Sequence, residues 1–208
     1  MHKEQDLSVV FDRIWQDLNA ATQQDDHPYR TPVVANAVAK NNEIKAEQRV
    51  VVLRRCDDSF YRLFFFTDSR SAKYDQLQEN SRLHWNFWNA ETGEQLRIDS
   101  EVTLHHQNPL TRKEWESASP GSLKVYMNVL PSGHCLKSPE PPQALEPDKH
   151  YTHEELTAGQ PFFVVVEAQV LNIDWLCIKT EPHQRAYFKR SEVTQQRPLT
   201  WEKHWSTP

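Results

Sequence analysis

The stretch FFFTDSRSAK, residues 64–73, joins a run of aromatic residues to a cluster of hydroxyl groups and cations. The aromatic run predicts a mostly buried β-strand. Ser71 is a candidate N-cap for a short helix that continues toward Asn80. The polar cluster therefore lies where a strand passes into a helix.

This polar cluster has two interpretations. Thr67, Ser69 and Ser71 offer hydroxyl donors, and Arg70 and Lys73 offer positive charge. The free N–H groups of the first helical turn would point the same way, so the cluster is a candidate phosphate site. The alternative is a polar turn that only caps the helix while both cations are solvated, and such turns are commoner than anion sites.

The segments around this stretch predict a mainly β fold with peripheral helices. Between residues 31 and 104, five segments have apolar or alternating patterns: TPVVANAV, QRVVVLRRC, FYRLFFFTD, RLHWNFWN and EQLRIDSEVTL. Turn-prone residues separate them, which favours an antiparallel meander. Three further strands are expected in PFFVVVEAQVLNID, DWLCIK and QRAYFKRS. We expect a closed or nearly closed β-barrel of antiparallel strands with helices packed outside.

Helical patterns lie mainly outside this run of strands. Within residues 1–30, apolar residues recur at helical spacing and predict a core-facing amphipathic helix with Ser8 as its cap. Asn108 and Pro109 predict the start of a second helix. Thr152 and Glu155 have the spacing of a capping box.

Residues 131–150 contain five of the thirteen prolines and predict a long irregular loop. With a length of 208 residues, the chain suits a single domain over residues 1–208. Only four glycines are present, so neither a Rossmann loop nor a P-loop is expected.

Composition excludes several kinds of partner. The net charge is −5 and the cations are dispersed, so we expect no nucleic-acid binding. No stretch approaches the roughly 20 apolar residues of a membrane span. The three cysteines are widely separated, which argues against a disulfide framework and favours a cytoplasmic protein.

Metal binding is not expected either. His134, Cys135, His150 and His153 lie in or beside the Pro-rich loop, but their separations match no standard zinc spacing. No residue can be assigned a catalytic role from the pattern alone.

Two arginines flank the segment RVVVLR. Arg49 is expected at the start of a strand and Arg54 at its end, so the two side chains would lie on opposite faces. They are candidate binding residues, or they are solubilising charges on an edge strand.

The order of these motifs resembles the pyridoxamine 5′-phosphate oxidase family and its FMN-binding split-barrel relatives. RVVVLR, FTDSRSAK with QLQEN, HWNFW, EQLRIDSEV and SPGS follow one another within about residues 30–190, and Trp175 is followed ten residues later by Arg185. The variant TDSRSAK is most similar to the branch of oxidase-related FMN proteins without an assigned activity. The resemblance implies an FMN-binding split β-barrel.

The resemblance also implies which residues contact FMN. They are Arg49, Val50, Val51, Val52, Phe66, Thr67, Arg70, Ser71, Lys73, Gln95, Trp175 and Arg185. Ala72 stands where the family usually has an arginine, and Arg70 would replace the lost charge. In the family, the late Trp and Arg come from the partner chain, which implies a homodimer with FMN at the interface. Ser132 is a weaker match to a phosphate contact, because Pro131 precedes it where Gln is usual.

On the substrate side the sequence departs from the family's oxidase. The candidates at the matching positions are Arg54, Trp115, Ser119, Ser122 and His183. Ser119 and Glu181 replace arginines that bind the substrate phosphate, and Glu181 would repel it. The resemblance therefore implies an FMN-dependent oxidoreductase acting by flavin hydride transfer on a different, unknown small substrate. The alternatives are an FMN-binding or flavin-carrier module without turnover, and a split barrel that binds haem.

Overall fold

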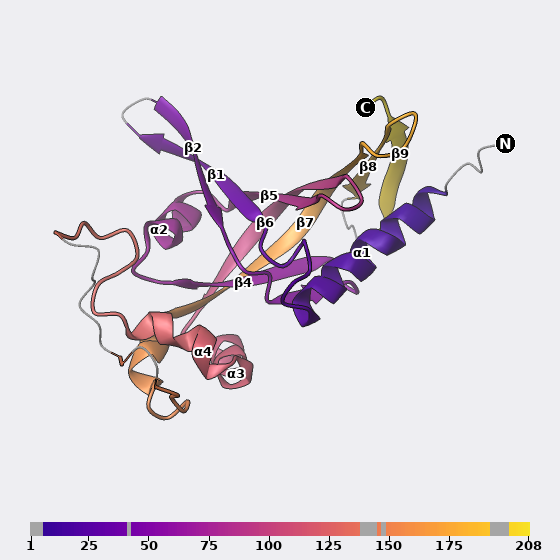
Figure 1. Ribbon diagram of the computed structural model, residues 1–208. Helices are drawn as coiled ribbons and strands as arrows, with labels where there is room; N and C mark the ends of the chain where they lie inside the picture. Colours follow the sequence, from indigo (N-terminus) through magenta and orange to yellow (C-terminus); the bar gives the residue numbers. More distant parts are fainter. Residues whose placement is uncertain (1–5, 41–42, 138–144, 147–148, 192–199) are drawn as a thin grey trace.

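A computed structural model describes residues 6–40, 43–137, 145–146, 149–191 and 200–208. Within these residues, nine strands form one curved sheet in which all neighbours are antiparallel (Figure 1). The strands are β1 (Val33–Lys40), β2 (Glu43–Val50), β3 (Arg55–Asp57), β4 (Arg62–Asp68), β5 (Arg82–Asn89), β6 (Glu94–His106), β7 (Phe163–Cys177), β8 (Gln184–Arg190) and β9 (Trp201–Ser206). The predicted mainly β architecture with antiparallel strands is confirmed.

The sheet forks at strand β7. The main order is β2-β1-β5-β6-β7-β4-β3, and β8 also pairs with β7 and carries β9 on its other side. The first part of β7 pairs with β4, and residues 172–177 pair with β8. Strand β6 accompanies β7 along both parts, with a register shift between Asp99 and Ser100.

Two strand predictions were wrong. The segments predicted as separate strands around residues 161–179 form the single strand β7, and β9 was not predicted. The segment QRVVVLRRC is also not one strand, because β2 ends at Val50 and β3 begins at Arg55. Between them, the N–H groups of Val51 and Leu53 donate to the carbonyl oxygens of Pro32 and Arg30. Arg49 and Arg54 therefore do not lie on opposite faces of the same strand.

The helices are short except for the first. They are α1 (Leu7–Gln23), α2 (Ala72–Glu79), α3 (Pro109–Ser117), α4 (Pro120–Leu123) and the 3₁₀ helices η1 (Lys124–Met127) and η2 (Thr157–Phe162). Ser71 is the N-cap of α2, and Asn108 caps α3 in a capping box with Thr111. Ser8 is not a cap, because the carboxylate of Asp6 accepts the Ser8 N–H at 2.8 Å and α1 starts earlier.

The predicted capping box at Thr152 and Glu155 forms its hydrogen bonds but leads into turns. The following segment is η2, which contains Gly159 and Pro161, two residues that disfavour an α-helix. Residues 131–137 contain no helix or strand, as expected for the Pro-rich loop. The parts of that loop at 138–144 and 147–148 lie outside the described residues.

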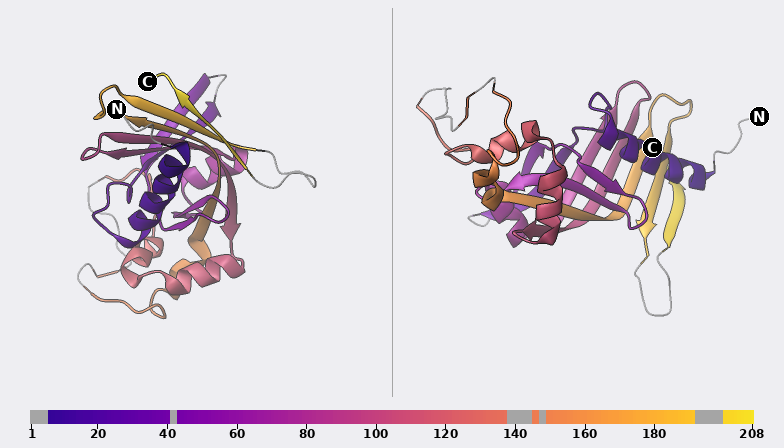
Figure 2. Two further views of the ribbon diagram at one scale, coloured as in Figure 1. Left: turned by 90° about the vertical axis from the view of Figure 1, so that its right-hand side faces the viewer. Right: turned by 90° about the horizontal axis from the view of Figure 1, so that it is seen from below.

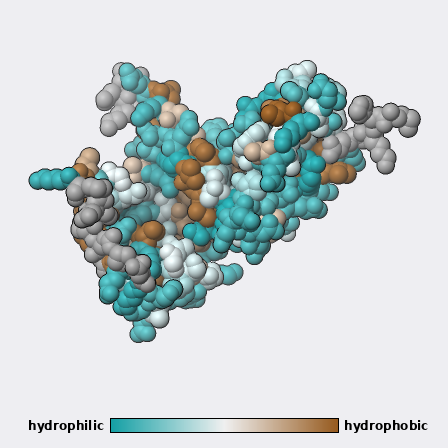
Figure 3. All heavy atoms as spheres, in the orientation of Figure 1, coloured by the Kyte–Doolittle hydropathy of each residue, from teal (hydrophilic) through white to brown (hydrophobic). Residues whose placement is uncertain are grey.

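Two hydrophobic clusters hold the elements together. Helix α1 lies against one side of the curved sheet, while α3 and α4 lie at the other end (Figure 2). The inward face of α1 joins the larger cluster, which confirms the predicted amphipathic helix. The smaller cluster consists of Phe64, Trp115, Leu123, Tyr126, Leu156, Phe163 and Val165. Figure 3 shows hydrophobic residues exposed near the middle of the face drawn in Figure 1.

None of the described helices is long and apolar enough to cross a membrane. In the same residues, no group of three or more His, Cys, Asp or Glu side chains is arranged to hold a metal ion.

Candidate functional site

A cavity of about 680 Å³ lies between the end of β2, the β4–α2 junction and residues 125–136. Its volume is in the range of ordinary small-molecule sites. Six residues of the predicted FMN set line it: Arg49, Val50, Phe66, Thr67, Ser71 and Lys73. The structure therefore brings the RVVVLR and TDSRSAK motifs together at one site.

Arg49 is the residue before the last in β2, and its side chain lines the cavity. Its guanidinium donates to Asn36 Oδ1 at 2.5 Å, to the Glu47 carbonyl oxygen at 2.7 Å and to Gln76 Oε1 at 2.5 Å. All three acceptors are uncharged. Burial lowers the pKa of Arg49, so its charge is partly removed from water without being neutralised by a hydrogen-bonded carboxylate.

Lys73 lies in the first turn of α2 and faces the same cavity. Its Nζ is 5.4 Å from the centroid of the Phe65 ring, and it forms no hydrogen bond or ion pair with any residue that the structure describes. Burial, followed by repulsion from Arg49, lowers the pKa of Lys73 to about 8. Lys73 is therefore a cation without an anionic partner in the part of the chain that the structure describes.

Two carboxylates also line the cavity, but each has its own cation. Glu47 pairs with Lys45 at 2.9 Å, and Asp68 pairs with Arg70 at 2.6 Å. Neither Lys45 nor Arg70 lines the cavity. The positive charges of Arg49 and Lys73 are thus left to attract a ligand.

The N-terminus of α2 adds donors to this wall. Ser71 makes no capping hydrogen bond to the helix. Its hydroxyl instead donates to the Asp68 carbonyl oxygen at 2.7 Å and lies 3.3 Å from Thr67 Oγ1. In the first turn the Tyr74 N–H already donates to the Ser71 carbonyl oxygen at 2.9 Å, which leaves the N–H groups of Ala72 and Lys73 available to an anion.

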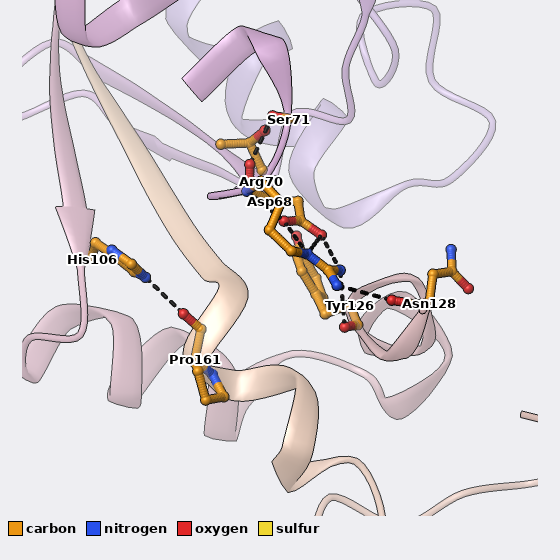
Figure 4. A network of polar contacts seen from close by, with 8 residues as sticks. Asp68, Arg70, Ser71, His106, Tyr126, Asn128 and Pro161 are labelled. Atoms are coloured by element: carbon orange, nitrogen blue, oxygen red, sulfur yellow. Dashed lines mark hydrogen bonds and ion pairs between the residues drawn. The ribbon is translucent and has the colours of Figure 1, made fainter. Parts of the chain in front are cut away.

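Arg70 does not line the cavity, and its guanidinium lies between Asp68 and the segment that carries Tyr126 and Asn128 (Figure 4). Its guanidinium binds the Asp68 carboxylate and donates to the carbonyl oxygens of Asn128 at 2.9 Å and Tyr126 at 3.3 Å. It also lies 3.8 Å from the centroid of the Phe162 ring. The expectation that Arg70 replaces the missing arginine at Ala72 has no support in this geometry, because the hydrogen bonds to Asp68 already hold its charge.

Val51 and Val52 do not line the cavity. Val51 is 6% exposed, and its N–H group is bound to Pro32 at 3.0 Å, so it is not free for a flavin. Gln95 donates to Asn86 Oδ1 at 2.7 Å, and it too lies outside the cavity.

Trp175 and Arg185 are also separate from the cavity, and they differ in exposure. Trp175 is 2% exposed, and its indole N–H donates to Glu94 at 3.0 Å. Arg185 is half-buried and binds Asp174 through two hydrogen bonds of 3.0 and 2.8 Å. Trp175 pairs across the ladder with Ala186, the neighbour of Arg185, so the two predicted side chains lie on opposite faces of the sheet. In this arrangement only Arg185 is placed to meet another molecule.

The five substrate-side candidates lie outside the cavity lining as well. Arg54 is half-buried behind one wall, with its guanidinium carbon 5.4 Å from the centroid of the Phe66 ring. Burial is the main cause that lowers the pKa of Arg54, and nearby Arg30 adds to it. Arg54 has no side-chain hydrogen bond or ion pair within the described part of the chain.

The other four candidates lie in a hydrophobic cluster, in a short helical turn or in an exposed connection, and none of them lines the cavity. Trp115 is buried against the Phe163 ring in the smaller hydrophobic cluster. The Ser122 hydroxyl donates to the Ser119 carbonyl oxygen at 2.8 Å within the short α4 turn. His183 is exposed in the connection between β7 and β8.

The sequence reasoning missed several residues of the cavity and its support. Asn36 and Gln76 hold Arg49, and Tyr126, Asn128 and His134 line the cavity from the segment after α4. Asn36 had a detectable signal, since it is a polar residue at a core-facing position of the apolar strand segment TPVVANAV. Gln76 lies in the quoted motif QLQEN, but nothing in the sequence indicated that it contacts Arg49. Tyr126, Asn128 and His134 had no signal, because their place at the cavity depends on contacts between distant segments.

Residues 12–106 match the sequence model described as the pyridoxamine 5′-phosphate oxidase, FMN-binding domain. These residues belong to that family. The matched part contains both Arg49 and Lys73, whereas residues 125–136 of the cavity wall follow it. No curated protein sequence matches the chain.

Solved structures of similar fold cover nearly the whole chain. A pyridoxamine 5′-phosphate oxidase-related, FMN-binding protein from Nostoc punctiforme PCC 73102 is 22% identical, with a TM-score of 0.68 over 95% of this chain and 96% of the other. PhzG from Burkholderia lata 383, in complex with tetrahydrophenazine-1-carboxylic acid, is 16% identical, with a TM-score of 0.64 over 97% and 92% of the two chains.

A protein related to general stress protein 26 from Clostridium acetobutylicum is 9% identical, with a TM-score of 0.53 over 86% and 95% of the chains. At these identities the likeness concerns the fold. The curved antiparallel sheet is the split barrel of the pyridoxamine 5′-phosphate oxidase family.

Proposed function

We propose that the cavity binds FMN and that the protein is an FMN-dependent oxidoreductase acting on a small substrate. The observation that supports this proposal is the pair of cations Arg49 and Lys73. They face one cavity, and no carboxylate of a described residue is bound to either. A phosphate dianion placed between them and the N-terminus of α2 would receive charge-assisted hydrogen bonds from both side chains.

The rest of the cavity suits the other parts of FMN. Its wall includes apolar side chains against which an aromatic ring system can pack: Val50, Phe66, Val125, Leu130 and Leu136. Only one end of the cavity carries the cation pair, and the chain has no glycine-rich loop for a second phosphate. These features favour FMN over FAD.

When bound, FMN would supply hydride transfer, and the protein would supply binding and electrostatics. Arg49 and Lys73 would fix the phosphate end. Tyr126 is 4% exposed and lines the cavity, and burial raises the pKa of its hydroxyl, so Tyr126 stays protonated at neutral pH. Tyr126 can therefore donate a hydrogen bond to a ligand without adding negative charge.

We further propose an acidic substrate held near Arg54. Arg54 is a half-buried guanidinium beside Phe66 and Tyr126, and no carboxylate among the described residues pairs with it. PhzG, which shares the fold, was solved with a carboxylic acid bound.

We propose that the active form is a homodimer with the cavity at its interface. A second hollow of about 580 Å³ lies on the outer face of the sheet, and Gln48 lines both it and the first cavity. A second copy seated on this face would therefore close the mouth of the first cavity. Asp174, the ion-pair partner of Arg185, lines the same outer hollow.

Reconstitution with FMN, FAD and riboflavin tests the proposal. Flavin fluorescence should give the highest affinity for FMN, because riboflavin lacks the phosphate and FAD has a second one. Reduction of the bound flavin by a panel of amines, aldehydes, organic acids, NADH and NADPH then tests turnover. Equal affinity for FMN and riboflavin would contradict the phosphate site, and no reduction by any donor would leave only a flavin-binding role.

A further inference from the structure

We propose that Asn36 and Gln76 are positioning residues that aim Arg49 at the FMN phosphate while leaving its charge uncompensated. This inference rests on the proposed function, because it assigns residues to the same phosphate site. Neither residue is among the FMN contacts that the resemblance implies, although Gln76 begins the quoted motif QLQEN.

Three elements meet at the guanidinium of Arg49. Asn36 lies on β1, opposite Glu47 of β2 in the ladder, and Gln76 lies one turn beyond Lys73 on α2. One guanidinium nitrogen of Arg49 donates to Asn36 Oδ1 and to the Glu47 carbonyl oxygen, and the other donates to Gln76 Oε1. A long, flexible side chain is thus held from both sides, which leaves it little freedom to turn away from the cavity.

The burial of Asn36 needs a reason beyond packing. Asn36 is 1% exposed, and its Nδ2 has no hydrogen-bond partner in the described residues. A buried donor without a partner is unfavourable, and the core position between Val34 and Val38 would suit an apolar residue. The amide oxygen must face Arg49, because a guanidinium has donors only. Holding Arg49 accounts for an asparagine at this position.

Asn36 and Gln76 are both uncharged, and this determines the charge of the ligand that the cavity favours. A carboxylate at position 36 or 76 would form an ion pair with Arg49 and would repel a phosphate dianion. An amide oxygen orients the same guanidinium without cancelling its charge. Asn36 and Gln76 therefore act as selectivity residues for a phosphorylated flavin over an unphosphorylated one.

The experiment measures the dissociation constants of FMN and riboflavin by flavin fluorescence for the wild-type protein, Asn36→Asp and Gln76→Glu. We expect each variant to raise the Kd for FMN at least tenfold and the Kd for riboflavin less than twofold. The melting temperature of the flavin-free variants should not fall, because a new ion pair with Arg49 forms. A role limited to fold stability would instead lower the melting temperature and weaken both ligands together.

Gln78→Glu is the matched control, since Gln78 is exposed on the same helix and bonds to Tyr74 rather than to Arg49. It adds the same charge and should leave both dissociation constants within twofold. If Asn36→Asp does not fold, Gln76→Glu decides alone, because Gln76 lies on a surface helix.

The two proposals can fail separately. A wild-type protein that prefers FMN, with variants that keep this preference within twofold, would overturn the positioning role alone. A wild-type protein that binds riboflavin as tightly as FMN would overturn the phosphate site and the positioning role with it.

Discussion

Arg49 and Lys73 face one cavity from β2 and α2, and the charge of Arg49 adds to burial in lowering the pKa of Lys73 to about 8. Two like charges at partly buried positions oppose folding unless an anion compensates them. The nearby carboxylates compensate them only in part, since Glu47 and Asp68 are each hydrogen-bonded to another cation, although the charge of Glu47 partly opposes the lowering of the pKa of Arg49. We interpret the arrangement as a binding site in which a bound phosphate compensates the two positive charges.

Replacing Lys73 by methionine should separate binding from stability. We expect Lys73→Met to weaken FMN binding by about 1.5–3 kcal/mol, the usual worth of a charge-assisted hydrogen bond. The melting temperature of the flavin-free protein should stay the same or rise, because a desolvated charge is removed. Fluorescence titration and thermal denaturation at pH 7 measure the two effects. Lys113→Met, at an exposed position of α3, should change neither, and equal FMN affinity in both variants would place the phosphate elsewhere.

The lowered pKa of Lys73 predicts a pH dependence of FMN binding. In the flavin-free protein Lys73 loses its proton as the pH rises through about 8, whereas its ordinary pKa is 10.5. FMN affinity should therefore decrease above pH 8, while riboflavin affinity should not change in the same way. Below about pH 6, protonation of the phosphate should also weaken FMN binding. Titrations between pH 5.5 and 9.5, roughly the span of these two ionisations, measure the profile.

The free energy of unfolding of the flavin-free protein should increase above pH 8, whereas the FMN affinity should decrease. Because the pKa of Lys73 is lower in the folded state, the unfolded state holds more protons between about pH 8 and 10.5, so this lysine makes a more favourable contribution as the pH rises through that window. Lys73→Met should abolish both slopes. Retention of the FMN slope in this variant would assign it to another group.

Arg70 should act on FMN binding through Asp68. Arg70→Ala removes the cation that pairs with Asp68 and leaves a carboxylate facing the cavity. We expect weaker FMN binding, together with a loss of stability of about 1–3 kcal/mol from the lost charge-assisted hydrogen bonds. The double variant Arg70→Ala with Asp68→Asn should recover most of the affinity. If Arg70 contacted the phosphate directly, the second substitution would restore nothing.

The outer face of the sheet should be the dimer interface. Ala35 lies on β1 and lines the outer hollow, so Ala35→Glu would place a charge in a closely packed contact. We expect light scattering to show a dimer for the wild-type protein, a monomer for Ala35→Glu, and weaker FMN binding in that variant. Ala158→Glu makes the same change at an exposed position of η2 and should remain dimeric. A wild-type monomer at all concentrations would contradict this interface.

The strand-to-helix junction could be predicted because its signals are local. The aromatic run of β4, the N-cap Ser71 and the cations near it lie within ten residues, so their proximity needs no knowledge of the rest of the fold. The orientation of Arg70 could not be predicted in this way. It depends on carbonyl oxygens of Tyr126 and Asn128, more than fifty residues away in the chain.

The polar positions of β7 explain the strand that was divided in error. Asn172 and Asp174 interrupt the apolar pattern and resemble a turn in the sequence, but they face outward from a continuous strand. The spacing of Trp175 and Arg185 also suggested a shared site, although the two side chains lie on opposite faces of the sheet. A separation of ten residues across two antiparallel strands does not reveal which face each side chain takes, and only the register of β7 with β8 settles it.

The continuity of β7 limits how its length can change. The same strand supports β4 beside the cavity and β8 at the opposite end, and it contains one extra residue between these two regions. Val170 pairs with Ser100 and Asn172 with Asp99, so Leu171 is bulged and the buried positions change there from even to odd numbers. One inserted residue near Val170 would turn Asp174 toward the core and Trp175 toward the outside, whereas two would restore the alternation. Outside the bulge at Leu171, insertions and deletions in this strand should therefore be tolerated in pairs of residues, and single ones should be selected against.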